Sequence, residues 1–186
     1  KNPKTYEHID PTLVGNHRTI VISNQSGRSN IISRLDRYGI KIDPNDSKVQ
    51  KILEEVKDRE FSGYSYDGAD ASFELLANRL LGKVPEYLKV DSYNVTVSKS
   101  KNINTKADVT FLIDNNKIKC EGEGNGPVNA LDNAIRSNFN KVEKYYNYFS
   151  DLKLLDYKVR ILNTGTEAIT RVLIESTDKT GVSWFT

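Results

Sequence analysis

The first part of the chain carries apolar residues at the intervals of three and four that are typical of amphipathic helices. Residues 26–39, 43–61 and 68–82 each show this period, and glycines end the first and the third segment. Asp46 or Ser47 is the expected N-cap of the second helix. The expected core-facing positions are Ile31, Ile32, Leu35, Val49, Ile52, Leu53, Val56, Ala69, Phe73, Leu76 and Leu80. Three short helices with tight connections predict a small helical subdomain.

At Pro85 the period changes from helical to alternating, which predicts strands. Residues 87–98, 107–114 and 117–124 are the expected strands, and Asn115-Asn116 is the expected two-residue hairpin turn. A long amphipathic helix should follow the third strand. Its expected apolar positions are Val128, Leu131, Ile135, Phe139, Val142, Tyr146 and Phe149.

The strand pattern then begins again, as in a duplicated unit. Residues 93–97 (YNVTV) resemble residues 157–161 (YKVRI), and residues 110–114 (TFLID) resemble residues 171–175 (RVLIE). The second copy reaches its third strand at residues 181–186 (GVSWFT) and stops before a second helix. The sequence therefore predicts two β-β-β-α units, the second of them truncated before its helix.

These patterns together predict an α+β fold in two parts. A helical subdomain should occupy residues 1–84, and the two β-β-β-α units should occupy residues 85–186. The chain starts with Lys1 and contains no methionine, so we expect it to be a piece of a longer protein. A second copy of the chain or a further segment should then cover the open face of the second sheet.

Composition and charge narrow the possible functions. The 27 Lys and Arg residues nearly balance the 25 Asp and Glu residues, with both signs interspersed. No basic stripe for a nucleic-acid partner results. No segment approaches the ~20 apolar residues of a membrane span, and no signal-peptide pattern opens the chain. Cys120 is the only cysteine, which excludes an internal disulfide and favours a reducing, cytoplasmic location.

The segment EGEGNGPVNALDNAIR, residues 121–136, places three glycines directly before the long helix. Pro127 stands at the favoured first helical position, where free N–H groups can bind a phosphate or a carboxylate. A nucleotide is disfavoured, because the last glycine is not followed by Lys and Ser or Thr. The glycine spacing and the hairpin strands also differ from the dinucleotide-binding fingerprint. Two interpretations remain: a tight strand-to-helix turn, or an anchor for a small carboxylate.

Other chemical signals are few. His8 and His17 are the only histidines, and both lie in an irregular segment that includes an expected short strand at Thr19–Ser23. They lack the further ligands of a zinc site and the nucleophile motif of a catalytic triad. Glu121 and Glu123 face the same side of a strand and can in principle share a proton for acid–base chemistry. A solvated strand end is the interpretation that we favour for this pair.

Two groups of motifs resemble the 2-isopropylmalate, citramalate and homocitrate synthase family. YEHIDPTLVGNHRTIVISNQSGRSNI, residues 6–31, is similar to the segment that follows the family's catalytic barrel. GEGNGPVNALDNAI, residues 122–135, followed by LLDYKVRILNTGTEA, residues 154–168, is similar to its C-terminal regulatory domain. The form of SYDGADASFELL, residues 65–76, and of HIDP…VGN is most similar to the citramalate synthase branch. The resemblance covers nearly the whole chain.

The resemblance implies a parent enzyme that condenses acetyl-CoA with a 2-keto acid, pyruvate in the citramalate branch, on a barrel holding a divalent metal. This chain lacks the barrel, so we expect it to be inactive alone and to hold no cofactor. It should contain the linker subdomain and most of a regulatory domain that forms a homodimer. Isoleucine is the expected feedback inhibitor, in branched-chain amino-acid biosynthesis, and neither a nucleic acid nor a membrane is an expected partner.

The resemblance also implies site residues. Tyr38 matches a linker position whose side chain reaches the partner subunit's active site, with helix-end packing as the alternative role. The expected effector-binding residues are Asn125, Gly126, Leu131, Asp132, Leu154, Tyr157, Ile161 and Ala168. Helix-end N–H groups would attract the effector's carboxylate, and Asp132 would attract its ammonium group. Leu131, Leu154 and Ile161 would surround a branched side chain.

Three identities stay open at this point. The first is a citramalate synthase region inhibited by isoleucine. The second is a 2-isopropylmalate synthase region that binds leucine, with a lysine-sensitive homocitrate synthase as a further variant. The third is a stand-alone amino-acid-sensing or dimerisation module without an attached enzyme. The sequence does not separate isoleucine from leucine, because the two differ in the position of one methyl group and a pocket discriminates such pairs by only ~1–3 kcal/mol.

Overall fold

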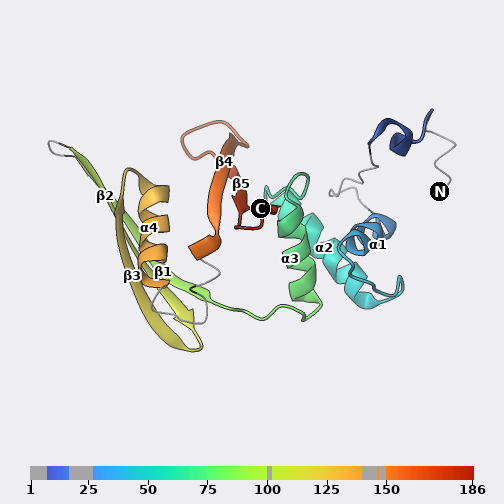
Figure 1. The fold of residues 1–186 in the computed structure, drawn as a ribbon, viewed down its shortest axis with the longest axis horizontal. Coiled ribbons are helices and arrows are strands. Elements are labelled where there is room, and N and C mark those ends of the chain that lie inside the picture. Colours follow the sequence, from blue (N-terminus) through green and yellow to red (C-terminus); the bar gives the residue numbers. More distant parts are fainter. Residues whose placement is uncertain (1–7, 17–26, 100–101, 140–145, 147–149) are drawn as a thin grey trace. The chain divides into compact units, whose positions relative to one another are not determined.

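The computed structural model describes residues 8–16, 27–99, 102–139, 146 and 150–186. It is a mixed α+β fold with helices first and two three-stranded sheets after them, as the sequence predicts (Figure 1). The helices are a 3₁₀ helix at Pro11–Val14, α1 (Arg28–Arg37), α2 (Ser47–Phe61), α3 (Asp70–Leu80) and α4 (Pro127–Phe139). The strands are β1 (Lys89–Lys99), β2 (Ile103–Ile113), β3 (Asn116–Gly124), β4 (Lys153–Ile161), β5 (Thr170–Thr177) and β6 (Ser183–Phe185).

Contacts divide the chain into two compact units. The helical unit comprises Lys1–Leu81, Val159–Leu173 and Phe185–Thr186, and the sheet unit comprises Gly82–Lys158 and Ile174–Trp184. The expected strand at Thr19–Ser23 and the expected helix positions Val142 and Phe149 lie outside the described residues.

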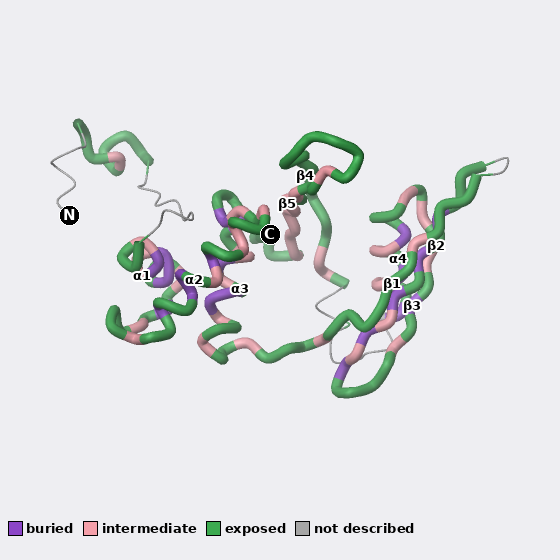
Figure 2. Tube along the Cα trace, turned by 180° about the vertical axis from the view of Figure 1, so that it is seen from behind, coloured by how far each residue is buried: buried purple, intermediate pink, exposed green. Residues whose placement is uncertain are grey.

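One apolar cluster forms the core of the helical unit. It contains Ile31, Leu35, Ile40, Val49, Ile52, Leu53, Val56, Tyr66, Phe73, Leu76 and Ala77, and Figure 2 shows the buried positions along α1, α2 and α3. The side chain of Asp46 caps α2 by accepting a hydrogen bond from the backbone N–H of Lys48 at 2.8 Å. The predicted faces are confirmed except at Leu80, which is 36% exposed because it lies in the last turn of α3.

A buried arginine joins α1 to α3 within this core. Arg34 is 2% exposed; it forms an ion pair with Asp70 and donates from Nη2 to the carbonyl oxygen of Tyr66 at 3.5 Å. Its guanidinium also lies 5.8 Å from the centre of the Phe73 ring. A buried cation is tolerated only with such partners, so the apolar period of α1 alone did not reveal this position as part of the core.

The first sheet is an antiparallel meander in the order β1-β2-β3. Ile113 pairs with Asn116 across the β2–β3 hairpin, so the turn consists of Asp114 and Asn115, at φ 48° and 65°. The predicted turn, Asn115-Asn116, was therefore one residue late. Two-residue turns of this type need two left-handed residues, and Asp and Asn both tolerate that conformation.

Helix α4 covers one face of this sheet (Figure 1). The cluster between them contains Ala107, Val109, Phe111, Ile113, Cys120, Ala130 and Ala134. Alternation along β2 turns the charged side chains of Lys106 and Asp108 to the opposite face, where they are exposed. The second sheet has the order β4-β5-β6, which confirms the duplicated unit that the sequence predicts.

Two glycines of β3 allow α4 to approach the sheet closely. A Cβ atom on Gly122 would lie 2.3 Å from the backbone nitrogen of Ala134 and 2.8 Å from the carbonyl oxygen of Ala130. A Cβ atom on Gly124 would lie 2.5 Å from the nitrogen of Ala130. Ala130 and Ala134 are themselves fully buried, so small residues meet on both sides of the contact.

Gly122→Ala is expected to destabilise the sheet unit by about 2–4 kcal/mol, because the clashing atoms are helix backbone and α4 must move as a whole. Urea denaturation followed by circular dichroism measures this loss. Gly126→Ala is the matched control: a Cβ atom there meets nothing within 4 Å, and the expected change is below about 1 kcal/mol. Equal stability of the two variants would contradict the packing role of Gly122.

Candidate functional site

Asparagine side chains of α4 form hydrogen bonds with the turn between β3 and α4. The backbone N–H of Asn125 donates to Oδ1 of Asn129 at 3.1 Å, and Nδ2 of Asn133 donates to the carbonyl oxygen of Glu123 at 2.8 Å. The first helical hydrogen bond runs from the N–H of Ala130 to the oxygen of Gly126 at 2.9 Å. Pro127 has no N–H, so the first turn offers a carboxylate the N–H groups of residues 128 and 129.

The predicted effector residues fall into two groups. Asn125, Gly126, Leu131 and Asp132 lie together at the start of α4, whereas Leu154, Tyr157 and Ile161 lie on β4 and Ala168 lies in the loop before β5. Ile161 and Ala168 belong to the helical unit, and the other six belong to the sheet unit. The structure thus brings together the four residues of the first group, and a shared site for all eight stays a prediction.

Leu131 and Asp132 point in different directions from α4. Leu131 is half-buried and packs against the cluster under the helix. Asp132 is on the outer side, where its Oδ2 accepts from Nε of Arg136 at 2.8 Å, one turn along the helix. A half-buried pair on neighbouring turns of one helix contributes only a few tenths of a kcal/mol. A ligand ammonium can therefore compete with Arg136 for the carboxylate.

The apolar side chains on β4 are largely exposed. Tyr157 is 48% exposed and Ile161 is 66% exposed. Side chains alternate along a strand, so these two residues share one face of β4 while Leu154 lies on the other. The face of Tyr157 and Ile161 is accordingly available to a ligand or to another chain.

The acidic residues of the glycine segment are solvated. Glu121 and Glu123 lie on the face of β3 opposite α4, and Glu123 pairs with Nζ of Lys106 at 2.8 Å. This hydrogen bond raises the pKa of the Lys106 ammonium group. The two carboxylates therefore form a charged outer face, which agrees with the strand-end interpretation.

Tyr38 is the residue that ends α1, and it packs against the core of the helical unit. Its ring centre lies 6.3 Å from that of Phe73, which in turn lies 6.1 Å from that of Tyr66 in an edge-on arrangement. Burial raises the pKa of the Tyr66 phenol, and the nearby charge of Arg59 opposes this rise. A packing role for Tyr38 is thus present in this chain.

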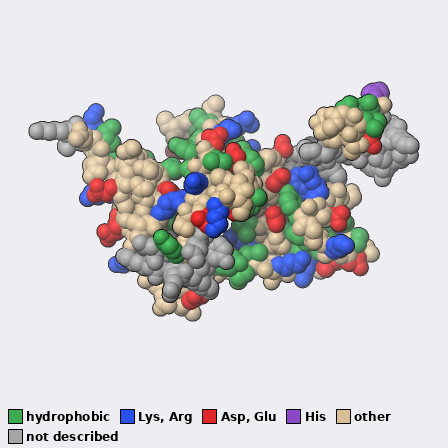
Figure 3. All heavy atoms as spheres, viewed as in Figure 1, with side chains coloured by type: hydrophobic (Ala, Val, Ile, Leu, Met, Phe, Trp, Pro, Cys, Tyr) green, Lys and Arg blue, Asp and Glu red, His purple; other side chains and the backbone are tan. Residues whose placement is uncertain are grey.

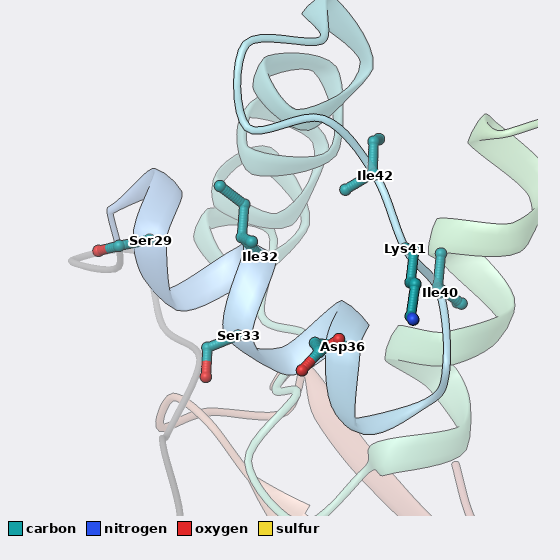
Figure 4. A pocket seen from close by; sticks show the side chains of 7 residues that line it. All are labelled: Ser29, Ile32, Ser33, Asp36, Ile40, Lys41 and Ile42. Atoms are coloured by element: carbon teal, nitrogen blue, oxygen red, sulfur yellow. The ribbon is translucent and has the colours of Figure 1, made fainter.

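Cavities among the described residues of the helical unit include one beside α1 and one beside the loop that follows α2. One, of about 390 Å³, is lined by Ser29, Ile32, Ser33, Asp36, Ile40, Lys41 and Ile42, with Asp36 on α1 and Lys41 on the segment that follows it (Figure 4). The other, of about 310 Å³, is lined by Ser62, Gly63, Tyr64, Ile169, Thr170, Arg171 and Val172. Neither cavity is lined by a predicted effector residue. The second is lined by Ile169, the residue that follows Ala168.

Charged side chains of both signs are interspersed on the visible surface (Figure 3). Within the described residues, no three His, Cys, Asp or Glu side chains are grouped so that they can hold a metal ion. His8 is exposed, and His17 lies outside the described residues. None of the described helices is long and apolar enough to cross a membrane.

Residues 67–186 match the family of the LeuA allosteric (dimerisation) domain. The chain belongs to this family. Residues 1–62 match the homocitrate synthase post-HMGL domain-like family, so the two matches follow one another in the order that the sequence motifs indicate.

Relatives of the same type cover nearly the whole chain. An (R)-citramalate synthase of Aquifex aeolicus is 43% identical over 183 residues, which are 96% of this chain and 34% of that protein. An (R)-citramalate synthase of Geobacter sulfurreducens is 43% identical over 185 residues, with the same coverage. One of Streptomyces coelicolor is 40% identical over 190 residues, which are 100% of this chain and 35% of that protein. The family resemblance is confirmed, and the chain spans about a third of the length of these relatives.

Tyr66→Phe is expected to reduce the loss of stability of the helical unit at alkaline pH. A pKa above the ordinary value of 10.0 in the folded state means that the folded protein holds the phenolic proton more tightly than the unfolded chain. The resulting stability is complete below pH ~10 and is lost as pH rises through the folded-state pKa. Thermal unfolding between pH 9 and 11 measures the difference, with the exposed Tyr64→Phe as control. The same alkaline loss in Tyr66→Phe as in the wild type would contradict this origin.

Proposed function

We propose that the chain is the linker and regulatory region of a citramalate synthase, an enzyme that condenses acetyl-CoA with pyruvate. The observation that supports this most directly is 40–43% identity to (R)-citramalate synthases over 96–100% of the chain. The match to an allosteric (dimerisation) domain supports a homodimer that responds to a small effector. The chain then acts by feedback inhibition, with isoleucine as the proposed effector of branched-chain amino-acid synthesis in the cytoplasm.

The chemistry of the effector site follows from the charges of an amino acid. Its carboxylate would accept from the N–H groups of the first turn of α4, at the positive end of the helix dipole. Its ammonium group would displace Arg136 from Asp132, since a pair one turn apart on a helix is weak. Its branched side chain would cover Tyr157, which is exposed in the single chain.

The proposed effector contacts thus remain the eight residues named from the sequence, with Leu131 contributing from the half-buried side of α4. Leu154 lies on the other face of β4 from Tyr157, so we give it a supporting contact at the edge of the pocket.

The reaction itself belongs to a part of the parent enzyme outside this chain. We propose that the divalent metal and acetyl-CoA bind to the barrel of the parent enzyme and that this chain alone does not turn over.

Leucine is the second candidate effector, because the family that the sequence resembles includes the 2-isopropylmalate synthases. A leucine-binding region would indicate a 2-isopropylmalate synthase. The names of the relatives favour citramalate synthase, and hence isoleucine.

Isoleucine is expected to bind the full-length protein that contains this chain at least about tenfold more tightly than leucine, valine or lysine. Calorimetric titration of the four amino acids measures this order. A preference for leucine would move the assignment to a 2-isopropylmalate synthase. No heat of binding from any of the four would contradict an amino-acid effector site.

Asp132→Asn is expected to weaken isoleucine binding by about tenfold or more, because a charge-assisted hydrogen bond to the ammonium group is lost. The full-length enzyme should then need correspondingly more isoleucine for half-maximal inhibition. Asp91→Asn is the matched control, since Asp91 likewise accepts from a cationic side chain, Nζ of Lys117, at 2.8 Å and lies on β1 outside the proposed site. Equal dissociation constants for the two variants would contradict the role of Asp132.

A further inference from the structure

An arginine of β5 holds the loop that follows α2. Nε of Arg171 donates to the carbonyl oxygen of Gly63 at 2.7 Å, and Nη2 donates to that of Tyr64 at 3.2 Å. All three residues belong to the helical unit. The guanidinium is a rigid planar fork, so two successive carbonyl groups held by it are fixed relative to β5.

The loop between β4 and β5 packs on the same point. Gly63 has φ +102°, and a Cβ atom on it would lie 2.8 Å from Cδ1 of Leu162 and 4.0 Å from Cγ2 of Ile169. Leu162 and Ile169 are joined by a backbone hydrogen bond of 2.9 Å, which closes the loop that carries Ala168. A shift of this loop therefore moves atoms that contact Gly63 directly.

On its other side, the loop after α2 enters the aromatic core of the helical unit. Tyr66 lies three residues after Gly63 and is only 2% exposed. Its carbonyl oxygen accepts from Arg34, and its ring packs edge-on against Phe73, which packs against Tyr38. The same short segment thus contacts the β4–β5 loop at Gly63 and the aromatic core at Tyr66.

We propose that residues 62–69, clamped by Arg171, couple the β4–β5 loop to the aromatic core that ends at Tyr38. An occupant that contacts Ala168 shifts the closed loop against Gly63, and the clamp transmits this shift through the backbone to Tyr66 and Phe73. Chains of packed and hydrogen-bonded groups can carry coupling between two sites, and these contacts form such a chain. Arg171 is a positioning residue, because it acts through backbone carbonyl groups. The regulatory part of this inference rests on the proposed function.

The clamp is tested first without any ligand. The N–H groups of Gly63 and Tyr64 donate to the oxygens of Glu60 and Arg59 at 3.0 Å each, so their hydrogen exchange reports on opening of the loop. Arg171→Gln is expected to accelerate this exchange by about tenfold or more, since two hydrogen bonds from a charged donor are lost. Arg171→Lys should give a smaller acceleration, because an ammonium group lacks the planar fork.

Arg160→Gln is the matched control, because Arg160 is exposed on β4 within the same unit. Its exchange at Gly63 and Tyr64 should equal that of the wild type. Unchanged exchange in Arg171→Gln would overturn the clamp. If Arg171→Gln does not fold, hydrogen exchange at Gly63 and Tyr64 is measured in Arg171→Lys, which keeps the charge, and unchanged exchange there would equally overturn the clamp.

The coupling is tested in the full-length protein with isoleucine. In Arg171→Gln, the dissociation constant of isoleucine is expected to differ from that of the wild type by no more than the ~5–150-fold of a typical allosteric coupling. At saturating isoleucine, however, the variant should lose most of the inhibition. Arg160→Gln should retain full inhibition. Full inhibition of Arg171→Gln at saturation would overturn the coupling. Failure of the wild-type protein to bind any amino acid would instead overturn the proposed function and the regulatory role together, while the exchange experiment still decides whether the clamp exists.

Discussion

The sheet unit depends on the close approach of α4 to β3. Gly122 and Gly124 face Ala130 and Ala134 with no room for a further carbon atom on the strand side. This contact fixes how the helix lies on the sheet, so that Val109, Phe111 and Cys120 fill the space beneath it. It also determines which part of α4 stays outside. The start of the helix and the carboxylate of Asp132 are left at the surface, where a charged ligand can reach them.

In the helical unit, the loop of residues 62–69 has backbone carbonyl groups that need hydrogen-bond donors. Arg34 from α1 donates to the oxygen of Tyr66, and Arg171 from β5 donates to those of Gly63 and Tyr64. Two arginines that are far apart in the sequence therefore donate to the carbonyl groups of one loop. The aromatic rings of Tyr66 and Phe73 make the same loop part of the core.

A regulatory role agrees with these features of the sheet unit and the helical unit. The chain belongs to the LeuA allosteric domain family, and we propose that the polar start of α4 and Tyr157 of β4 bind a small zwitterion. The two glycines of β3 serve packing, and the segment forms a tight strand-to-helix turn. An anchor for a small carboxylate at the first turn of α4 stays a prediction.

The sequence by itself determined the order and type of the elements, because the periods of α1, α2, α3 and the strands are local properties of side-chain spacing. The duplicated strands and the family motifs could be recognised for the same reason. The hairpin turn was misplaced by one residue, since Asp114, Asn115 and Asn116 all tolerate turns and only the pairing of Ile113 with Asn116 selects among them. Only the tertiary structure decided the roles of Gly122, Arg34 and Arg171. Their partners are Ala134, Asp70 and Gly63, which lie on other elements, and no local period of a sequence encodes such contacts.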